Sequence, residues 1–126
     1  MLSNCKIGAI VFFVRELGRT IAFYRDTLGL SVNHIDGHDG PLGIADVGGV
    51  ELVFIVREVT IGSSPVVVFA IDGGIDEYAE ALAEKGVEIV VPVSEAPDGG
   101  LTLDFIDPDQ NRLSLYQPAG APRRKR

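Results

Sequence analysis

Residues 8–32 read GAIVFFVRELGRTIAFYRDTLGLSV, and this stretch decides the fold. Its start continues a β-branched and aromatic run, Lys6–Val14, which is typical of a buried strand. In Glu16–Leu28, apolar residues recur at positions 17, 21, 24 and 28, the spacing of one helical face. Gly29 follows, where a helix commonly ends in a left-handed residue. The stretch therefore predicts a strand, a helix and a second strand, Leu30–Asp36.

Two further apolar runs complete the first half of the chain. They are Leu42–Val47 and Val50–Arg57, and only Gly48-Gly49 separates them. Two glycines between such runs predict a tight hairpin. The preceding segment, His38–Pro41, is rich in turn-forming residues and predicts a loop. The first half thus predicts a βαβββ module.

The same order restarts after the polar, glycine-containing linker 60–65. The second half predicts these elements: strand Val66–Ile71, helix Ile75–Lys85 ended by Gly86, strand Val87–Val93, a proline-rich loop at 92–100, and strands Leu101–Ile106 and Arg112–Gln117. A shift of 57 residues places Phe12 on Phe69 and Gly29 on Gly86. Two copies of one unit are the simplest account of this repetition.

The predicted fold class is therefore α+β, with two tandem βαβββ modules forming a curved mixed sheet around a cleft. We expect one domain over residues 1–118, in which the modules occupy 6–58 and 66–117. A basic tail, 119–126, follows it. A chain of 126 residues suits one domain with a proper core.

Composition and charge limit the classes of function. The one cysteine fits a reducing compartment, no signal-peptide pattern is present, and no apolar run approaches the length that spans a bilayer. We therefore expect a cytoplasmic protein that is not inserted in a membrane. The net charge of −7 argues against nucleic acid and favours a neutral or cationic small molecule. For the basic run Arg123–Arg126 we expect a solvated tail, with docking on an acidic surface or a weak polyanion contact as the alternatives.

Two motifs resemble those of the vicinal oxygen chelate superfamily, which includes glyoxalase I, extradiol dioxygenases, fosfomycin-resistance enzymes and bleomycin-resistance proteins. The first is Phe23-Tyr24 followed by Leu28-Gly29-Leu30. The second is Phe105-Ile106-Asp107-Pro108-Asp109 followed by Asn111, with Gln110 where the family has glycine. The resemblance extends over residues 6–118 and implies the two-module fold. We interpret Asp107 as a turn-former and not as a catalytic acid or base.

The resemblance also implies where metal ligands would stand, on the inward faces of the first and last strands of each module. The corresponding positions here carry Ala9, Val66 and Ser114, and only Glu51 keeps a ligating side chain. Alanine and valine cannot coordinate a metal, and a neutral hydroxyl is a poor ligand. We expect no cofactor and no divalent metal, with Glu51 the one residual candidate.

Strand alternation predicts which side chains line the cleft. If Ala9 faces inward, its neighbours at alternate positions do so too, whereas Phe12 and Val14 pack on the helix. The predicted lining is Ala9, Val11, Phe13, Glu51, Val53, Ile55, Val66, Val68, Asp104, Ser114 and Tyr116, with Thr102 beside them. A plain core or a dimer interface is the alternative use of this apolar face.

No residue is assigned a catalytic role. His34 and His38 lie four apart in an extended segment, where that spacing does not favour chelation. We interpret them as surface or rim histidines, with His34 as a hydrogen-bonding wall of the cleft the alternative. Cys5 has no neighbour in sequence that would lower its pKa or supply a base, so we interpret it as a buried or edge thiol, with a nucleophile as the alternative.

Two functions of different classes remain. The sequence favours a metal-free protein, resembling bleomycin-resistance proteins, which binds a small organic molecule and forms a homodimer. The alternative is a metal-dependent glyoxalase-like lyase, isomerase or dioxygenase with an atypical site. Only Glu51 and the family resemblance support the alternative.

Overall fold

The computed structural model describes residues 1, 3–4, 7, 9–37, 40–58, 60, 62, 64–96 and 98–125. The chain divides into two compact units, unit 1 (Met1–Ser64) and unit 2 (Pro65–Arg126). Cys5 and His38 lie outside the described residues. Among the described residues, no helix has the length and apolar character needed to cross a membrane.

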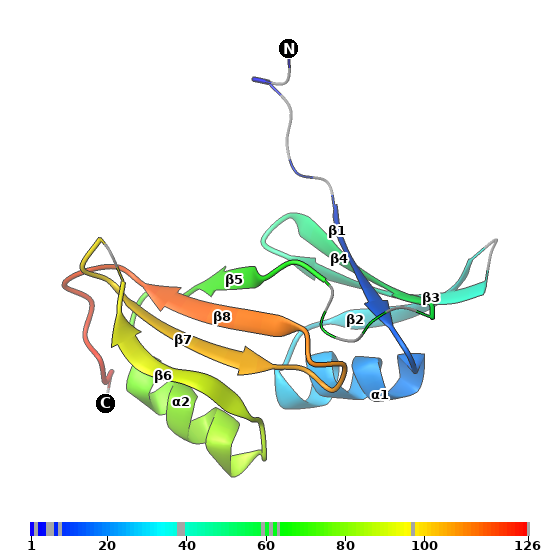
Figure 1. Cartoon of the computed structure of the whole chain (residues 1–126). Helices are drawn as coiled ribbons and strands as arrows, with labels where there is room; N and C mark the ends of the chain where they lie inside the picture. Colours follow the sequence, from blue (N-terminus) through cyan, green and yellow to red (C-terminus); the bar gives the residue numbers. More distant parts are fainter. Residues whose placement is uncertain are drawn as a thin grey trace. The chain divides into compact units, whose positions relative to one another are not determined.

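Unit 1 contains a four-stranded sheet and one helical segment (Figure 1). Its elements are β1 (Ala9–Val14), α1 (Leu17–Ala22), the π-helix η1 (Phe23–Thr27), β2 (Val32–Gly37), β3 (Gly40–Val47) and β4 (Val50–Val56). The strand order is β1-β4-β3-β2, with β1 parallel to β4 and the other neighbours antiparallel. The Gly48-Gly49 hairpin is confirmed, since both glycines have the positive φ that this turn requires.

Unit 2 repeats this topology. Its elements are β5 (Val67–Ala70), α2 (Ile75–Glu84), β6 (Ile89–Glu95), β7 (Leu101–Ile106) and β8 (Arg112–Gln117). The order β5-β8-β7-β6, with β5 parallel to β8, matches the order in unit 1 position for position. Gly29 and Gly86, which the 57-residue shift superposes, end their helices at φ +78° and +77°. The predicted repeat of two βαβββ modules is confirmed.

One aromatic cluster forms the core of unit 1. The ring of Tyr24 lies 4.4 Å from that of Phe54 and 6.1 Å from that of Phe12, and all three residues are fully buried. The single helix expected over 16–28 is instead a short α-helix followed by the π-helix η1, which contains Tyr24. Gly43 on β3 lets the helix come close, because a Cβ there would lie 3.4 Å from Leu17 and Ile21.

The prediction of a proline-rich loop over residues 92–100 is wrong for the first half of that range. β6 continues through Pro92 to Glu95, and its pairing with β7 shifts register twice. Proline lacks a donor for the ladder, but β6 is an edge strand with bulges, where that loss is tolerated. The loop therefore spans only the residues between Glu95 and Leu101.

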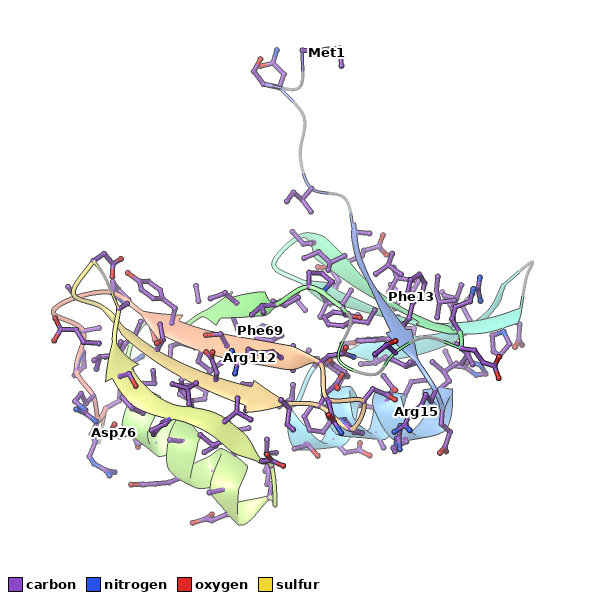
Figure 2. The ribbon with its side chains drawn as sticks, in the orientation of Figure 1. Met1, Phe13, Arg15, Phe69, Asp76 and Arg112 are labelled. Carbon is purple, nitrogen blue, oxygen red and sulfur yellow. The ribbon has the colours of Figure 1, made fainter. Side chains whose placement is uncertain are left out.

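The C-terminal residues dock on α2, contrary to the expectation of a solvated tail (Figures 1 and 2). The Gly74 N–H donates to Pro122 O (2.8 Å), and the Asp76 N–H donates to Arg123 O (3.1 Å). Gly73 leaves room for this contact, since a Cβ there would lie 3.2 Å from Pro122. Gly74, the N-cap of α2, has no side chain that could accept hydrogen bonds from the first N–H groups of the helix. Backbone carbonyls of the tail accept them instead.

Ion pairs with α2 and with Asp72, which precedes it, hold the same tail. Arg123 donates to both carboxylate oxygens of Asp76, and the tail's next two cations pair with other acids: Arg124 with Glu80 and Lys125 with Asp72. The hydrogen bond from Arg123 lowers the pKa of the Asp76 carboxyl below its ordinary value. Arg126 lies outside the described residues. The alternative interpretation of the tail, docking on an acidic surface, is the correct one.

Candidate functional site

Each sheet has one face that a helix covers and one that it does not, and we call the second the helix-free face. In β1 the side chains alternate as predicted. Phe12 and Val14 are fully buried on the side of α1, whereas Val11 and Phe13 are each 40% exposed on the helix-free face. Alternate exposure of large apolar side chains on a regular strand marks a surface available for contact.

Strand pairing brings the predicted residues of unit 1 together on this face. Val11 pairs with Val53 and Phe13 with Ile55 across the β1–β4 ladder, while Ala9 pairs with Glu51. Directly paired residues point to the same face, so all six lie on the helix-free side. Three apolar residues that the sequence pattern did not place in the site extend these rows into β3 and β2: Ile44, Leu42 and Ile35.

One edge of this apolar face is acidic. Glu51 pairs with Asp46 of β3, and the two carboxylates lie on the same face, next to the small side chain of Ala9. Asp46 is held in place because its Oδ1 accepts the Gly49 N–H at 3.0 Å. Two neighbouring carboxylates disfavour an anion nearby and favour a cation.

The predicted residues of unit 2 also share one face. Val68, Ser114 and Asp104 are register partners across β5, β8 and β7, and the next row joins Tyr116 with Thr102. Val66 precedes β5 and is 52% exposed, and Val68 is 57% exposed. Buried Leu103, Phe105, Leu113 and Leu115 alternate with these residues and form the opposite, helix-covered side.

Polar groups on the helix-free face of unit 2 are largely engaged within the unit. The Arg112 guanidinium lies 3.8 Å from the Asp104 carboxylate. Ser114 is only 5% exposed, and its hydroxyl donates to Leu115 O at 3.4 Å. Tyr116 donates its hydroxyl proton to Asp98, a residue of the β6–β7 loop that the sequence analysis did not single out. This bond raises the pKa of Tyr116 and lowers that of Asp98.

The donor set does not fit a divalent metal at the positions that the resemblance indicated. Ala9 and Val66 have no ligating atom, and the Ser114 hydroxyl is engaged with the backbone. Within the described part of the chain, no three His, Cys, Asp or Glu side chains gather where they could hold one ion. The absence of a metal stays a prediction, which the metal content of the protein can test.

His34 does not lie on the helix-free face, where its alternative interpretation as a wall of the cleft would require it to be. It pairs with Gly43, which in turn pairs with buried Phe54, so it faces the helix-covered side of the sheet. There it lines a surface hollow of about 590 Å³, and its Nε2 lies 3.8 Å from Asp36. Since its side chain is 54% exposed, His34 is a surface histidine and no wall of the helix-free face.

A second hollow of unit 1, of about 1030 Å³, is lined by Arg15, Val56, Arg57, Glu58 and Thr60. It contains no residue that the sequence analysis placed in the site. Arg57 donates to Val56 O at 2.8 Å, so part of its hydrogen-bonding capacity is used locally.

The turn between β7 and β8 confirms the structural role of Asp107. Its Oδ1 accepts the N–H groups of Asp109 (2.9 Å) and Asn111 (2.8 Å), and its Oδ2 accepts the Asn111 side-chain amide (3.0 Å). Gln110 has φ +63°, a left-handed conformation that glycine adopts more easily. The backbone therefore explains why glycine is the usual residue of this motif.

Comparisons with known proteins agree with this architecture. The family model described as "Glyoxalase/Bleomycin resistance protein/Dioxygenase superfamily" matches residues 6–115. No curated protein matches the chain. Several solved structures share the fold at low sequence identity.

Three of these structures carry names that mention activity, binding or family. An antibiotic binding protein from Streptomyces sp. CB03234, TnmS3, is 23% identical with a TM-score of 0.80, over 94% of this chain and 100% of that one. A glyoxalase family protein from Enterococcus faecalis is 22% identical (TM-score 0.76; 93% and 100% covered). A lactoylglutathione lyase from Agrobacterium tumefaciens is 17% identical (TM-score 0.73; 90% and 94% covered). At these identities the similarity shows the fold alone.

Proposed function

Because the chain belongs to the glyoxalase/bleomycin resistance protein/dioxygenase superfamily, we propose that it binds a small organic molecule on its helix-free sheet faces without a catalytic metal. One observation carries the proposal: regular strands expose a continuous apolar surface. Val11 and Phe13 are each 40% exposed although their β1 neighbours Phe12 and Val14 are buried, and Ile35 on β2 is 41% exposed. Ligand sites are mostly apolar with a few placed polar groups, which describes this surface.

The charge distribution supports a neutral or cationic ligand. Glu51 and Asp46 stand side by side at one edge of the apolar rows of unit 1. The whole chain carries a net charge of −7, so its long-range field attracts cations and repels anions. Salt screens this field, and apolar contact remains as the larger source of affinity.

The fold by itself does not decide between binding and catalysis, since the superfamily's structures include both an antibiotic binding protein and a lyase. The residues at the site favour binding. A divalent metal that activates a substrate needs three or four protein ligands, and Ala9, Val66 and Ser114 offer none of the usual ones.

A second candidate rests on the paired carboxylates Glu51 and Asp46. Two oxygen ligands from neighbouring strands are the start of a metal site, and a glyoxalase-like lyase, isomerase or dioxygenase could complete it with ligands from a substrate. Glu51→Ala removes one of the two ligands. This variant therefore separates the candidates in the experiment below.

Metal content is the first test. Untagged protein is incubated with Zn²⁺, Ni²⁺, Mn²⁺ and Fe²⁺, desalted and measured by inductively coupled plasma mass spectrometry. We expect no stoichiometric metal, and the Glu51→Ala variant should not differ. About one ion per chain or per dimer that is lost in Glu51→Ala would reject metal-free binding and favour the enzyme.

Ligand binding is the second test, by thermal shift against a library of neutral and cationic aromatic compounds. Val53→Lys places a charge in the middle of the apolar rows of unit 1 and should abolish the shift for compounds that bind there. Tyr78→Lys, at a position of α2 that is 46% exposed, adds the same charge elsewhere and should leave the shift unchanged. Equal effects of both variants would contradict binding on this face.

We also propose that the protein is a homodimer. β1 and β5 are edge strands, and the exposed Val66 and Val68 lie at or beside one of them. Edge strands and exposed apolar side chains are both features that association covers. Sedimentation equilibrium tests this, and a mass of one chain at about 100 µM would reject it.

A further inference from the structure

The helix-free face of unit 2 ends in a row of polar side chains. Ala70, Tyr116, Thr102 and Ser94 are register partners across β5, β8, β7 and β6. Asp98, from the β6–β7 loop, meets this row through its hydrogen bond with Tyr116. The row thus combines hydroxyl groups and one carboxylate at one end of the face that also carries Val68, Ser114 and Asp104.

Two of the hydroxyl protons of this row, those of Tyr116 and Ser94, are donated to groups within the unit. Tyr116 donates its proton to Asp98 Oδ2, and Ser94 donates its proton to Pro92 O at 2.6 Å. A hydroxyl has a single proton and two lone pairs. Once the proton is used, the oxygen can offer only lone pairs to an incoming group, so Tyr116 and Ser94 act there as acceptors.

The backbone fixes the Asp98 carboxylate in this arrangement. Its Oδ1 accepts the Gly100 N–H at 2.9 Å. Gly100 in turn fits tightly, because a Cβ there would lie 2.5 Å from Gln117 O and 2.7 Å from Cε1 of Tyr116. The hydrogen bonds from Tyr116 and from the Gly100 N–H both lower the pKa of Asp98, so the carboxylate is ionised at neutral pH. An ionised carboxylate is a pure acceptor.

The other acid of this face is placed differently. Asp104 has the Arg112 guanidinium 3.8 Å away, and that cation compensates its charge. A ligand cation near Asp104 would meet Arg112 as well, whereas no cation among the described residues pairs with Tyr116 or Asp98. The polar contact that a cation can use therefore lies at Tyr116, four residues along β8 from Arg112.

We propose that Tyr116 and Asp98 form a subsite that selects ligands by a hydrogen-bond donor, an ammonium or amidinium group. The inference rests on the proposed function, since it names the chemical class that the binding face takes. A donor cation can bond to the lone pairs of Tyr116 Oη and to Asp98, whereas at these two groups a carbonyl or carboxylate meets only acceptors and is repelled. Charge-assisted hydrogen bonds of this kind are stronger than hydrogen bonds between neutral groups.

Three probes of one shape test the selection: benzamidine, benzamide and benzoate. Each is titrated into the full-length protein, and the amide shifts of residues 70, 94, 102 and 116 are followed by NMR. We expect benzamidine to bind most tightly and benzoate most weakly, with about a three- to tenfold difference in Kd between the two at this exposed site.

Asp98→Asn is the decisive variant, because it reverses the direction of one hydrogen bond. The oxygen of the new side-chain amide can keep accepting the Gly100 N–H, and then the amide nitrogen must donate to Tyr116 Oη. The Tyr116 proton is thereby released toward the ligand, so Tyr116 becomes a donor. We expect the preference for benzamidine over benzoate to disappear or to reverse.

Asp36→Asn is the matched control, since it changes the net charge equally at an exposed position of unit 1. It should keep the preference for benzamidine. If wild-type protein binds all three probes equally, or if both variants change the preference alike, the inference is wrong while small-molecule binding stands. If none of the probes shifts these amides and the library also gives no thermal shift, the proposed function itself fails.

Discussion

Gln117, near the end of the chain, accepts a hydrogen bond from the backbone N–H of Ile75, the first residue of α2, at 3.0 Å. Its amide group also donates to Ala121 O at 3.0 Å, and the side chain is 1% exposed. One buried side chain thus caps a helix 42 residues earlier in sequence and ties the tail to it.

Replacing Gln117 by Leu should lower the free energy of unfolding by about 1–3 kcal/mol, because the Ile75 N–H would stay buried without an acceptor. Urea denaturation followed by circular dichroism measures the change. Gln110→Ala, in an exposed turn, serves as the control and should change stability by less than about 0.5 kcal/mol. Equal stability of the two variants would show that the cap contributes nothing.

Gln110→Gly should stabilise the protein by about 0.5–1 kcal/mol. Gln110 has φ +63°, and glycine relieves that strain, although its greater freedom in the unfolded chain offsets part of the gain. Gly29→Ala provides the reciprocal variant, since Gly29 has φ +78° and no atom within 4 Å of an added Cβ. It should destabilise by about 1 kcal/mol through backbone strain alone. Urea midpoints of both variants test the pair of predictions.

Asp107→Ala should destabilise by at least about 2 kcal/mol, since three donors of the β7–β8 turn lose their acceptor. Thermal unfolding measures the loss, and Asp36→Ala is the exposed control. If ligand binding survives in folded Asp107→Ala protein, the residue acts through the turn alone. Lost binding with unchanged stability would instead assign it a direct role.

The docked tail should make stability depend on pH and salt. Arg123 lowers the pKa of Asp76, and Arg124 lowers that of Glu80, from ordinary values of 3.8 and 4.5. A carboxyl with a lowered folded pKa stabilises the protein above its unfolded pKa, and this contribution is lost as pH falls through the folded pKa. The ion pairs therefore stabilise at pH 7 and weaken below about pH 4.

The double variant Arg123→Gln/Arg124→Gln isolates this contribution. Its Tm should be below that of the wild type at pH 7 in low salt, and the difference should shrink at pH 3 and in 1 M NaCl. Arg25→Gln removes one exposed arginine, which pairs with its neighbour Asp26, and controls for half of the charge change in the double variant. A Tm difference that is independent of pH would mean that the tail docks through its backbone bonds alone.

Sequence patterns predicted most of the fold because alternation and helical spacing report burial directly. Alternation along β1 distinguished its buried face, with Phe12 and Val14, from its exposed face, with Val11 and Phe13. β7 and β8 begin and end at the residues predicted for them. The boundary of β6 was missed because Pro92 normally marks a loop, whereas an edge strand with bulges accommodates it.

The contacts that were missed join segments far apart in sequence. Asp98 lies in a loop 18 residues before Tyr116, and no local pattern predicts that their side chains meet. The docked tail did have a signal: Asp76 and Glu80 recur at helical spacing, Asp72 precedes the helix, and the three acids match three consecutive cations. Charge complementarity between the two segments would have favoured docking over a solvated tail.

The docked tail also determines how the protein can be attached to a surface. Arg123 and Lys125 bond to Asp76 and Glu77 of α2, and α2 covers one side of the sheet of unit 2 (Figure 1). A biotin or linker placed after the last residue would therefore hold unit 2 by its helix-covered side. Its helix-free face, with Tyr116, lies on the opposite side of the sheet from this attachment, so C-terminal immobilisation suits a biosensor assay of this site.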